Sequence, residues 1–306
     1  MFSIVSCAYL VARKFTKVNP TLCNSVFRIF VILTLPFFGS ILIADTYTFV
    51  VIKYFKESEG IKKAIIAALT PVIMLPFIAI TKYIILRKGL NIITPERRFV
   101  LCYPLGGGSI VLYRTMQSGF NNIWLFVGLS LLHGVLNVLI DATQSFRTKM
   151  WSFFIKRLSN TSCVPRLEML PAESPQVRRL DTDLKIQDVL FQYTTVILSQ
   201  AYLACYLVLN FDVSPWRVIR TSLIRIAISC SIDFVFNIIS MFIQIHFYGI
   251  HICKVWLKHW RRHVAANIFI VVCIALYFGA SLVSVFADNK RLFSAEYKLR
   301  NCTTVF

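Results

Sequence analysis

Six polar side chains recur along one long apolar stretch of the chain, residues 218–249. At about 100° per residue they fall within an arc of roughly 120° on one helix, with Asp233 near its middle. Ionisable groups at membrane depth are costly, so we expect this face to point toward protein or water rather than lipid. The six residues, called the polar stripe below, are Arg225, Ser229, Asp233, Asn237, Ser240 and Gln244.

Two kinds of chemistry fit the polar stripe. In the first, the helix lines a water-filled path or binds an ion, and Asp233 is the binding or proton-carrying group. In the second, Asp233 pairs with a basic residue, for which Lys82 and Arg225 are the candidates, while the amides and hydroxyls join helices. The sequence leaves both interpretations open.

A second, narrower polar face lies in the preceding apolar segment, residues 189–209. Gln192, Thr195, Ser199 and Tyr202 lie within about 80° of one another on a helix. Only the short loop of residues 210–217 separates the two segments, so we expect them to be antiparallel neighbours with their polar faces together. Gln192 and Ser199 therefore join the candidate ion-path residues. The alternative is that the two polar faces hydrogen-bond to each other and leave no path between them.

The histidines invite a metal or catalytic reading that the surrounding residues disfavour. His259 and His263 have the i, i+4 spacing of a chelating pair, but neighbouring lysine and arginine disfavour a cation. A belt of Trp, Arg and His at the membrane interface accounts for them better. His133 is alone in an apolar segment, and we expect it to hydrogen-bond within the bundle. The sequence therefore predicts no metal, no cofactor, no catalytic residue and no enzyme.

Composition and patterning predict an all-α, polytopic transmembrane bundle. Hydrophobic residues make up 57% of the chain, charged residues 15%, and the mean hydropathy is +0.67. Apolar runs of about 20 residues match the roughly 30 Å hydrocarbon core of a bilayer. A further segment, residues 99–113, is interrupted by Pro104 and three glycines, so it is a short seventh span, a re-entrant segment or a buried linker. The six predicted spans are residues 29–52, 64–86, 122–140, 189–209, 218–249 and 265–286.

These segments divide the chain into five regions and leave one polar region between two transmembrane halves. Residues 147–158 pattern as a basic amphipathic helix on the membrane surface, with Lys149, Trp151, Lys156 and Arg157 as its surface residues. The net charge of +19 then indicates basic loops that face anionic headgroups. No basic run alternates with aromatics in a soluble domain, so we expect no nucleic-acid partner. The regions are residues 1–28 (basic, interfacial), 29–143 (first half), 144–187 (surface helix and polar linker), 188–288 (second half) and 289–306 (tail).

Sidedness depends on the status of residues 99–113. With six spans, lysine and arginine divide almost evenly between the two sides, whereas a seventh span makes the side of the N-terminus and the polar region the richer one. The positive-inside rule then places that side in the cytosol. Asn160 and Asn301 each begin an N-glycosylation sequon, and every one of these topologies puts them on opposite faces.

Three functional classes follow from these patterns. The first is a transporter or channel-like protein built around the polar stripe. The alternative is a non-catalytic membrane receptor or scaffold that docks lipids or a partner through its basic loops. A lipid-modifying enzyme that uses His133 or the clustered histidines is the weaker alternative, because carboxylates are scarce and no catalytic motif accompanies them.

Overall fold

The fold is all-α in every residue range that the computed structural model describes. Those residues are Tyr9, Leu10, Arg13, 26–58, 60–88, 98–161, 174–250 and 252–287. The long helices are α2 (Val26–Glu57), α3 (Gly60–Lys88), α4 (Arg98–Ser118), α5 (Ile123–Ala142), α6 (Gln144–Thr161), α7 (Pro175–Asn210), α8 (Pro215–Tyr248) and α9 (Ile252–Ala287).

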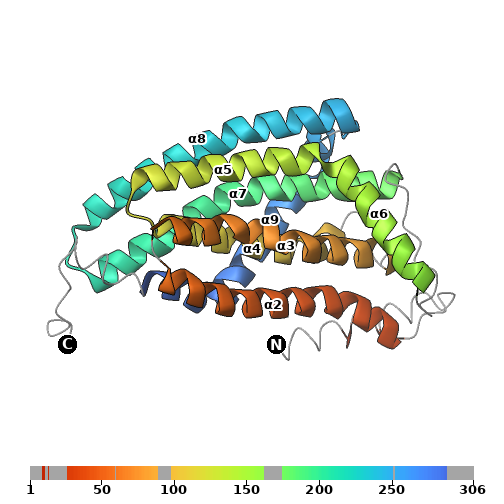
Figure 1. The fold of residues 1–306 in the computed structure, drawn as a ribbon, viewed down its shortest axis with the longest axis horizontal. Helices are drawn as coiled ribbons and strands as arrows, with labels where there is room; N and C mark the ends of the chain where they lie inside the picture. Colours follow the sequence, from red (N-terminus) through yellow and green to blue (C-terminus); the bar gives the residue numbers. More distant parts are fainter. Residues whose placement is uncertain are drawn as a thin grey trace.

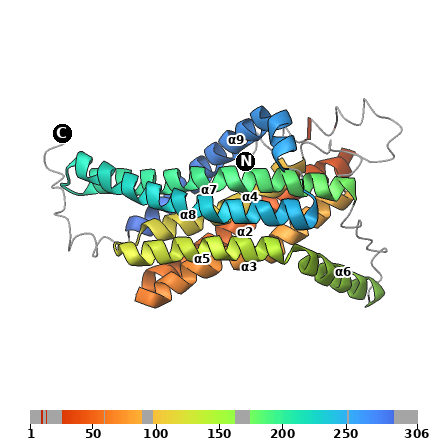
Figure 2. The ribbon, with the colours of Figure 1, turned by 90° about the horizontal axis from the view of Figure 1, so that it is seen from above.

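Helices α2, α3, α4, α5, α7 and α8 run along one bundle and alternate in direction, and α9 continues the alternation but crosses the others obliquely (Figures 1 and 2). Helix α6 leaves the bundle at one end (Figures 1 and 2). We call the end where α5 finishes and α6 lies the basic end. Helix α4 begins there, with Phe99 packed against Leu180 and Ala266, and it finishes at the opposite end, where Arg225 binds the Ser118 carbonyl. This alternation is the arrangement that the seven-span expectation requires.

Helix α4 is the central helix of the bundle, and it contains the ambiguous segment 99–113. The segment is one continuous helix despite Pro104 and the three glycines, rather than a re-entrant loop or a linker. Most of α4 is buried, because α2, α3, α7 and α9 surround it. Gly107 permits this packing, since a Cβ there would lie 3.1 Å from the Phe191 ring of α7.

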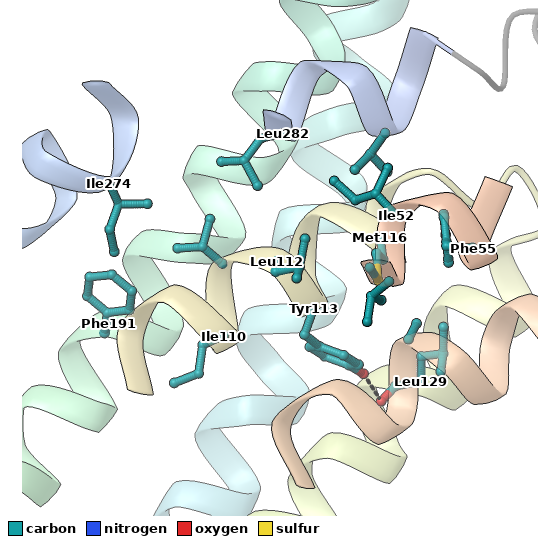
Figure 3. Packing of buried hydrophobic residues seen from close by; sticks show 14 of the residues in the cluster. Ile52, Phe55, Ile110, Leu112, Tyr113, Met116, Leu129, Phe191, Ile274 and Leu282 are labelled. Atoms are coloured by element: carbon teal, nitrogen blue, oxygen red, sulfur yellow. Dashed lines mark hydrogen bonds between the residues drawn. The ribbon is translucent and has the colours of Figure 1, made fainter. Parts of the chain in front are cut away.

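The apolar core lies around the second half of α4. Ile52 and Phe55 of α2 meet Met116 of α4, while Phe191 of α7 lies beside Ile274 of α9 (Figure 3). The same region contains a polar link, because the buried Tyr113 hydroxyl donates to the Leu129 carbonyl of α5 at 2.6 Å (Figure 3).

Three described helices are long and apolar enough to cross a membrane: Gly60–Leu86, Ile123–Ala142 and Pro215–Tyr248. The first contains the predicted span 64–86, and the other two contain all but one residue of the predicted spans 122–140 and 218–249. The other three predicted spans lie within α2, α7 and α9. A total of six or seven spans stays a prediction.

Helix α8 has its polar side inside and its apolar side outside. Apart from Val218, its buried residues are all polar, and they are five members of the polar stripe. Phe234, Val235, Ile238 and Phe242 are exposed on the other side. This arrangement reverses that of a water-soluble helix, and it is the one expected for a helix that faces lipid.

The region 144–187 differs in part from the prediction. Residues 147–158 are helical, as α6. The predicted linker is wrong from Pro175 onward, because α7 already begins there and continues through residue 187. Ser174 caps this helix by accepting a hydrogen bond from the Val177 amide, and Pro175 occupies the first turn, where it is favourable.

Candidate functional site

The polar stripe meets a fully buried arginine of α4. Arg114 places Nη2 2.5 Å from Asp233 Oδ2, and both side chains are only 1% exposed. Its Nη1 atom donates to Ser229 Oγ at 3.0 Å and to Gln117 Oε1 at 2.9 Å. Gln117 in turn donates to Ser130 of α5. Three helices thus converge on one buried ion pair.

A second buried cluster lies nearer the basic end, around Asp141 of α5. Lys185 Nζ of α7 is 2.5 Å from Asp141 Oδ2, and Gln244 Nε2 of α8 donates to Asp141 Oδ1 at 2.9 Å. Ser240 donates to the same carboxylate. Asp188, one turn from Lys185, places Oδ2 3.7 Å from its Nζ. Asp141 is therefore a buried partner of α7 and α8.

An amide pair lies between these two clusters. Asn237 of α8 donates to Gln192 Oε1 of α7 at 2.9 Å, and Gln192 Nε2 donates to Asp188 Oδ2 at 3.2 Å. The predicted meeting of the two polar faces therefore occurs at Gln192. Thr195 and Ser199 are buried on the same side, but their hydroxyls donate to carbonyls of their own helix.

Arg225 ends the polar stripe at the opposite end of the bundle. It donates to the carbonyls of Ser118 and Asn121, and its guanidinium lies 5.6 Å from the Phe126 ring centroid. From Arg225 to Gln244 the helix rises by about 28 Å at 1.5 Å per residue, close to the thickness of the hydrocarbon core.

We use "polar seam" for the residues of the two buried clusters and of the amide pair, which lie between α4, α5, α7 and α8. Its contacts are direct hydrogen bonds or ion pairs, and its stripe members are 0–4% exposed. The seam consists of Arg114, Gln117, Ser130, Asp141, Lys185, Asp188, Gln192, Ser229, Asp233, Asn237, Ser240 and Gln244.

The expected partners of Asp233 are wrong. Lys82 forms an ion pair with Asp181 of α7. Arg225 lies two turns before Asp233 on α8 and donates to backbone carbonyls instead. Arg114 takes that role. Arg114 was not among the predicted partners, because the apolar segment was delimited by hydropathy and ends at residue 113, one position before it. Its i, i+3 spacing to Gln117 is the sequence signal that points to a polar face there.

Helices α5 and α8, which both contribute residues to the seam, pack closely against each other. A Cβ built on Gly134 would lie 2.2 Å from Phe236 Cδ2, so only glycine fits without movement of the ring. His133, beside this contact, is 2% exposed, stacks on Tyr113 with centroids 4.7 Å apart, and hydrogen-bonds Asn137.

The interfacial-belt interpretation is wrong for His263. This side chain is fully buried, with Nε2 3.2 Å from Asp183 Oδ1 and Nδ1 3.1 Å from Gln187 Nε2. Arg179 and Arg262 also bind Asp183. The backbone of His259 is non-helical at a kink in α9. Among the described residues, no group of His, Cys, Asp or Glu is arranged to hold a metal ion.

The predicted membrane-surface residues all lie on α6, outside the bundle. Lys149 and Arg157 are exposed, and Trp151 is half-buried. Lys156 and Asn160 lie on the same helix, whereas Asn301 lies outside the described residues. Arg147 anchors the start of α6 by donating to the Ile140 carbonyl at 2.6 Å. Burial at this junction lowers the pKa of Arg147 from its ordinary value, against the opposing effect of Asp141 and Asp181.

Two acceptor atoms of the seam are buried without a hydrogen-bond partner among the described residues. They are Asp233 Oδ1 and Gln244 Oε1. An unpaired buried acceptor costs free energy, so each has capacity for a proton donor. The seam therefore contains two buried acceptors with spare hydrogen-bonding capacity, in addition to contacts that hold four helices together.

Comparison with known proteins gives no match: no family model, curated protein or solved structure resembles the chain significantly. The fold and the site define a class: an all-helical protein with helices suited to a membrane and with buried ion pairs between them.

Proposed function

We propose that the protein is a multi-pass integral membrane protein that passes a small ion along the polar seam, with Asp233 at its centre. The alternating helices support the multi-pass assignment, and the buried carboxylates support the transport assignment. Ionisable groups inside a membrane bundle are costly, and their usual role is in ion or proton pathways. The proposal assigns no catalytic step.

The observation that carries the proposal is the extent of the polar contacts along α8. They begin at Arg225 near one end of the bundle and reach Gln244 at the other, over about the thickness of a bilayer core. Helix contacts alone need fewer polar groups, because membrane helices associate well through small residues such as Gly134. An ion path, in contrast, needs polar groups at every depth of the membrane.

The test is ion flux through the full chain in liposomes. Vesicles that contain the protein should dissipate an imposed proton, sodium, potassium or chloride gradient faster than empty vesicles. Asp233→Asn should reduce that flux at least tenfold, because the amide keeps the side chain's size but removes its charge. Asp45→Asn is the matched control, since Asp45 is an exposed carboxylate on α2, away from the seam. Normal flux in a folded Asp233→Asn protein would exclude the proposal.

A second function, docking on anionic lipid, is favoured by α6. Outside the bundle, α6 exposes Phe146, Met150, Phe153 and Phe154 beside basic residues. Apolar and basic groups on one projecting helix match the interface of an anionic leaflet. We propose that α6 lies in that interface at the basic end.

Lipid enrichment tests the docking proposal. Replacement of Lys149, Lys156 and Arg157 by serine should lower the ratio of phosphatidylglycerol to phosphatidylcholine retained by the purified protein, measured by native mass spectrometry. The control replaces Lys53, Lys62 and Arg220, which are exposed at the opposite end. Equal loss in both triple variants would mean that α6 has no special role.

A further inference from the structure

We infer that the ion carried by the polar seam is a proton and that Asp188, beside Lys185 and Asp141, is where it enters from the basic end. This inference rests on the proposed function and names its substrate. It begins from the charges within the seam, where three carboxylates share two cations. Asp233 has Arg114 as its partner, so Asp141 and Asp188 share Lys185.

The sharing of Lys185 is unequal. Its ammonium is 2.5 Å from Asp141 but 3.7 Å from Asp188, and Asp141 also accepts from Ser240 and Gln244. Asp188 accepts a hydrogen bond from the Gln192 amide but none from α8 among the described residues. Of the two carboxylates, Asp188 is therefore the less stabilised as an anion, and it is the one that gains most by taking up a proton.

Asp188 is more accessible to solvent than its neighbours in the seam. Its side chain is 29% exposed, against 12% for Asp141 and 5% for Lys185. It immediately precedes the apolar segment 189–209, so it lies at the boundary where water from the basic end meets the bundle. A hydronium ion in that water breaks one O–H bond and becomes water, while the Asp188 carboxylate gains the proton as a new O–H bond and becomes neutral. Lys185 stays paired with Asp141.

The groups that face Asp188 favour a proton over a larger cation. From its own helix comes the Lys185 ammonium, which repels a metal ion. Asp141 on α5 and Asp233 on α8 act on Asp188 through their negative charges, and both already have cationic partners, while Asp188 acts in the same way on the Tyr103 hydroxyl of α4. A metal ion needs several oxygen ligands around one cavity, whereas a proton needs one oxygen and moves between groups in direct contact.

Asp233 Oδ1 provides an acceptor further along the seam. It is buried without a hydrogen-bond partner among the described residues. Gln192 and Asn237 lie between Asp188 and Asp233 and hydrogen-bond to each other. The seam thus has an exchangeable carboxylate at the basic end and an acceptor in its interior.

The first experiment identifies the ion. The full chain is reconstituted in liposomes that contain a pH-sensitive dye, and a potassium diffusion potential is set with valinomycin. Internal pH should follow the potential, and replacement of sodium by choline or of chloride by gluconate should leave the rate unchanged. Asp188→Asn should slow the pH change at least tenfold, while Asp212→Asn, an exposed carboxylate in the α7–α8 loop, should not.

The outcomes separate this inference from the proposed function. A flux of sodium, potassium or chloride that depends on Asp233 would overturn the proton assignment and leave the transport function standing. The absence of any flux would overturn both. A wild-type proton flux in Asp188→Asn would remove Asp188 as the entry site.

A second measurement needs no variant and so does not depend on how Asp188→Asn folds. Dicyclohexylcarbodiimide modifies protonated carboxyl groups in apolar surroundings. Peptide mass spectrometry of the treated wild-type protein should find the adduct on Asp188, with labelling that falls as pH rises and with little label on Asp141. Labelling of Asp141 in preference to Asp188, or no labelling of either, would overturn the assignment.

Discussion

Arg114 on α4 and Asp233 on α8 form an ion pair at 2.5 Å in which both side chains are almost completely buried. The two residues are 119 positions apart in the chain, and the contact joins the central helix to the helix with the polar stripe. Removal of one partner from such a pair leaves an uncompensated buried charge, whereas removal of both does not.

The first prediction concerns this coupling. Arg114→Met and Asp233→Leu should each lower the free energy of unfolding by about 3–5 kcal/mol, the usual cost of breaking a buried pair. The double variant should lose clearly less than the sum. Unfolding in bicelles, followed for all four proteins of the cycle, measures the difference. Strict additivity would show that the two side chains do not interact.

The second prediction concerns the approach of α5 to α8. Gly134→Ala should destabilise the protein by about 1–3 kcal/mol, because the new methyl group meets the Phe236 ring. Gly128→Ala on the same helix is the matched control, since a Cβ there meets nothing within 4 Å, and it should be neutral or stabilising.

A rescue variant makes the Gly134 prediction more specific. Phe236→Ala in the Gly134→Ala background should recover part of the lost stability in the same unfolding assay. Equal effects of Gly128→Ala and Gly134→Ala would mean that the helices do not meet at Gly134.

The third prediction concerns sidedness. Helix α6, which carries Asn160, lies at the basic end, whereas α9 finishes at the opposite end, where Phe286 packs near Tyr206 and Phe211. With the basic end in the cytosol, Asn301 should be glycosylated in a eukaryotic cell and Asn160 should not. Asn301→Gln should abolish the mobility shift caused by glycosidase. Glycosylation of Asn160 instead would show that the basic end faces the lumen and that the predicted orientation is wrong.

The sequence predicted the helical class and the polar stripe because both depend on local periodicity. Four of the six expected spans fall entirely within helices, the other two extend one residue beyond α5 and α8, and five stripe residues form the buried polar side of α8. The Gln192 contact was also foreseeable, because a short loop makes α7 and α8 neighbours.

The partners across the bundle were missed because pairing between distant helices leaves no local pattern. Arg114 lay just outside a segment delimited by hydropathy. Lys185 lay in a region interpreted as linker because of its charges and prolines, and Asp188 was the first residue after that region. One signal was available: Lys185, Asp188, Gln192, Thr195 and Ser199 recur at spacings of three and four, which continues one helical face. His263 gave none, since its burial depends on how α9 packs against α7.

The most direct test of the central claim exchanges the two charges of the buried pair. A protein with both Arg114→Asp and Asp233→Arg keeps an ion pair between α4 and α8 but moves the carboxylate to another helix. If the seam is a path that uses Asp233, unfolding stability should recover toward wild type relative to either single variant, while proton flux in liposomes stays at least tenfold below wild type. Recovery of both stability and full flux would contradict the account, because the pair would then act only to hold the helices together.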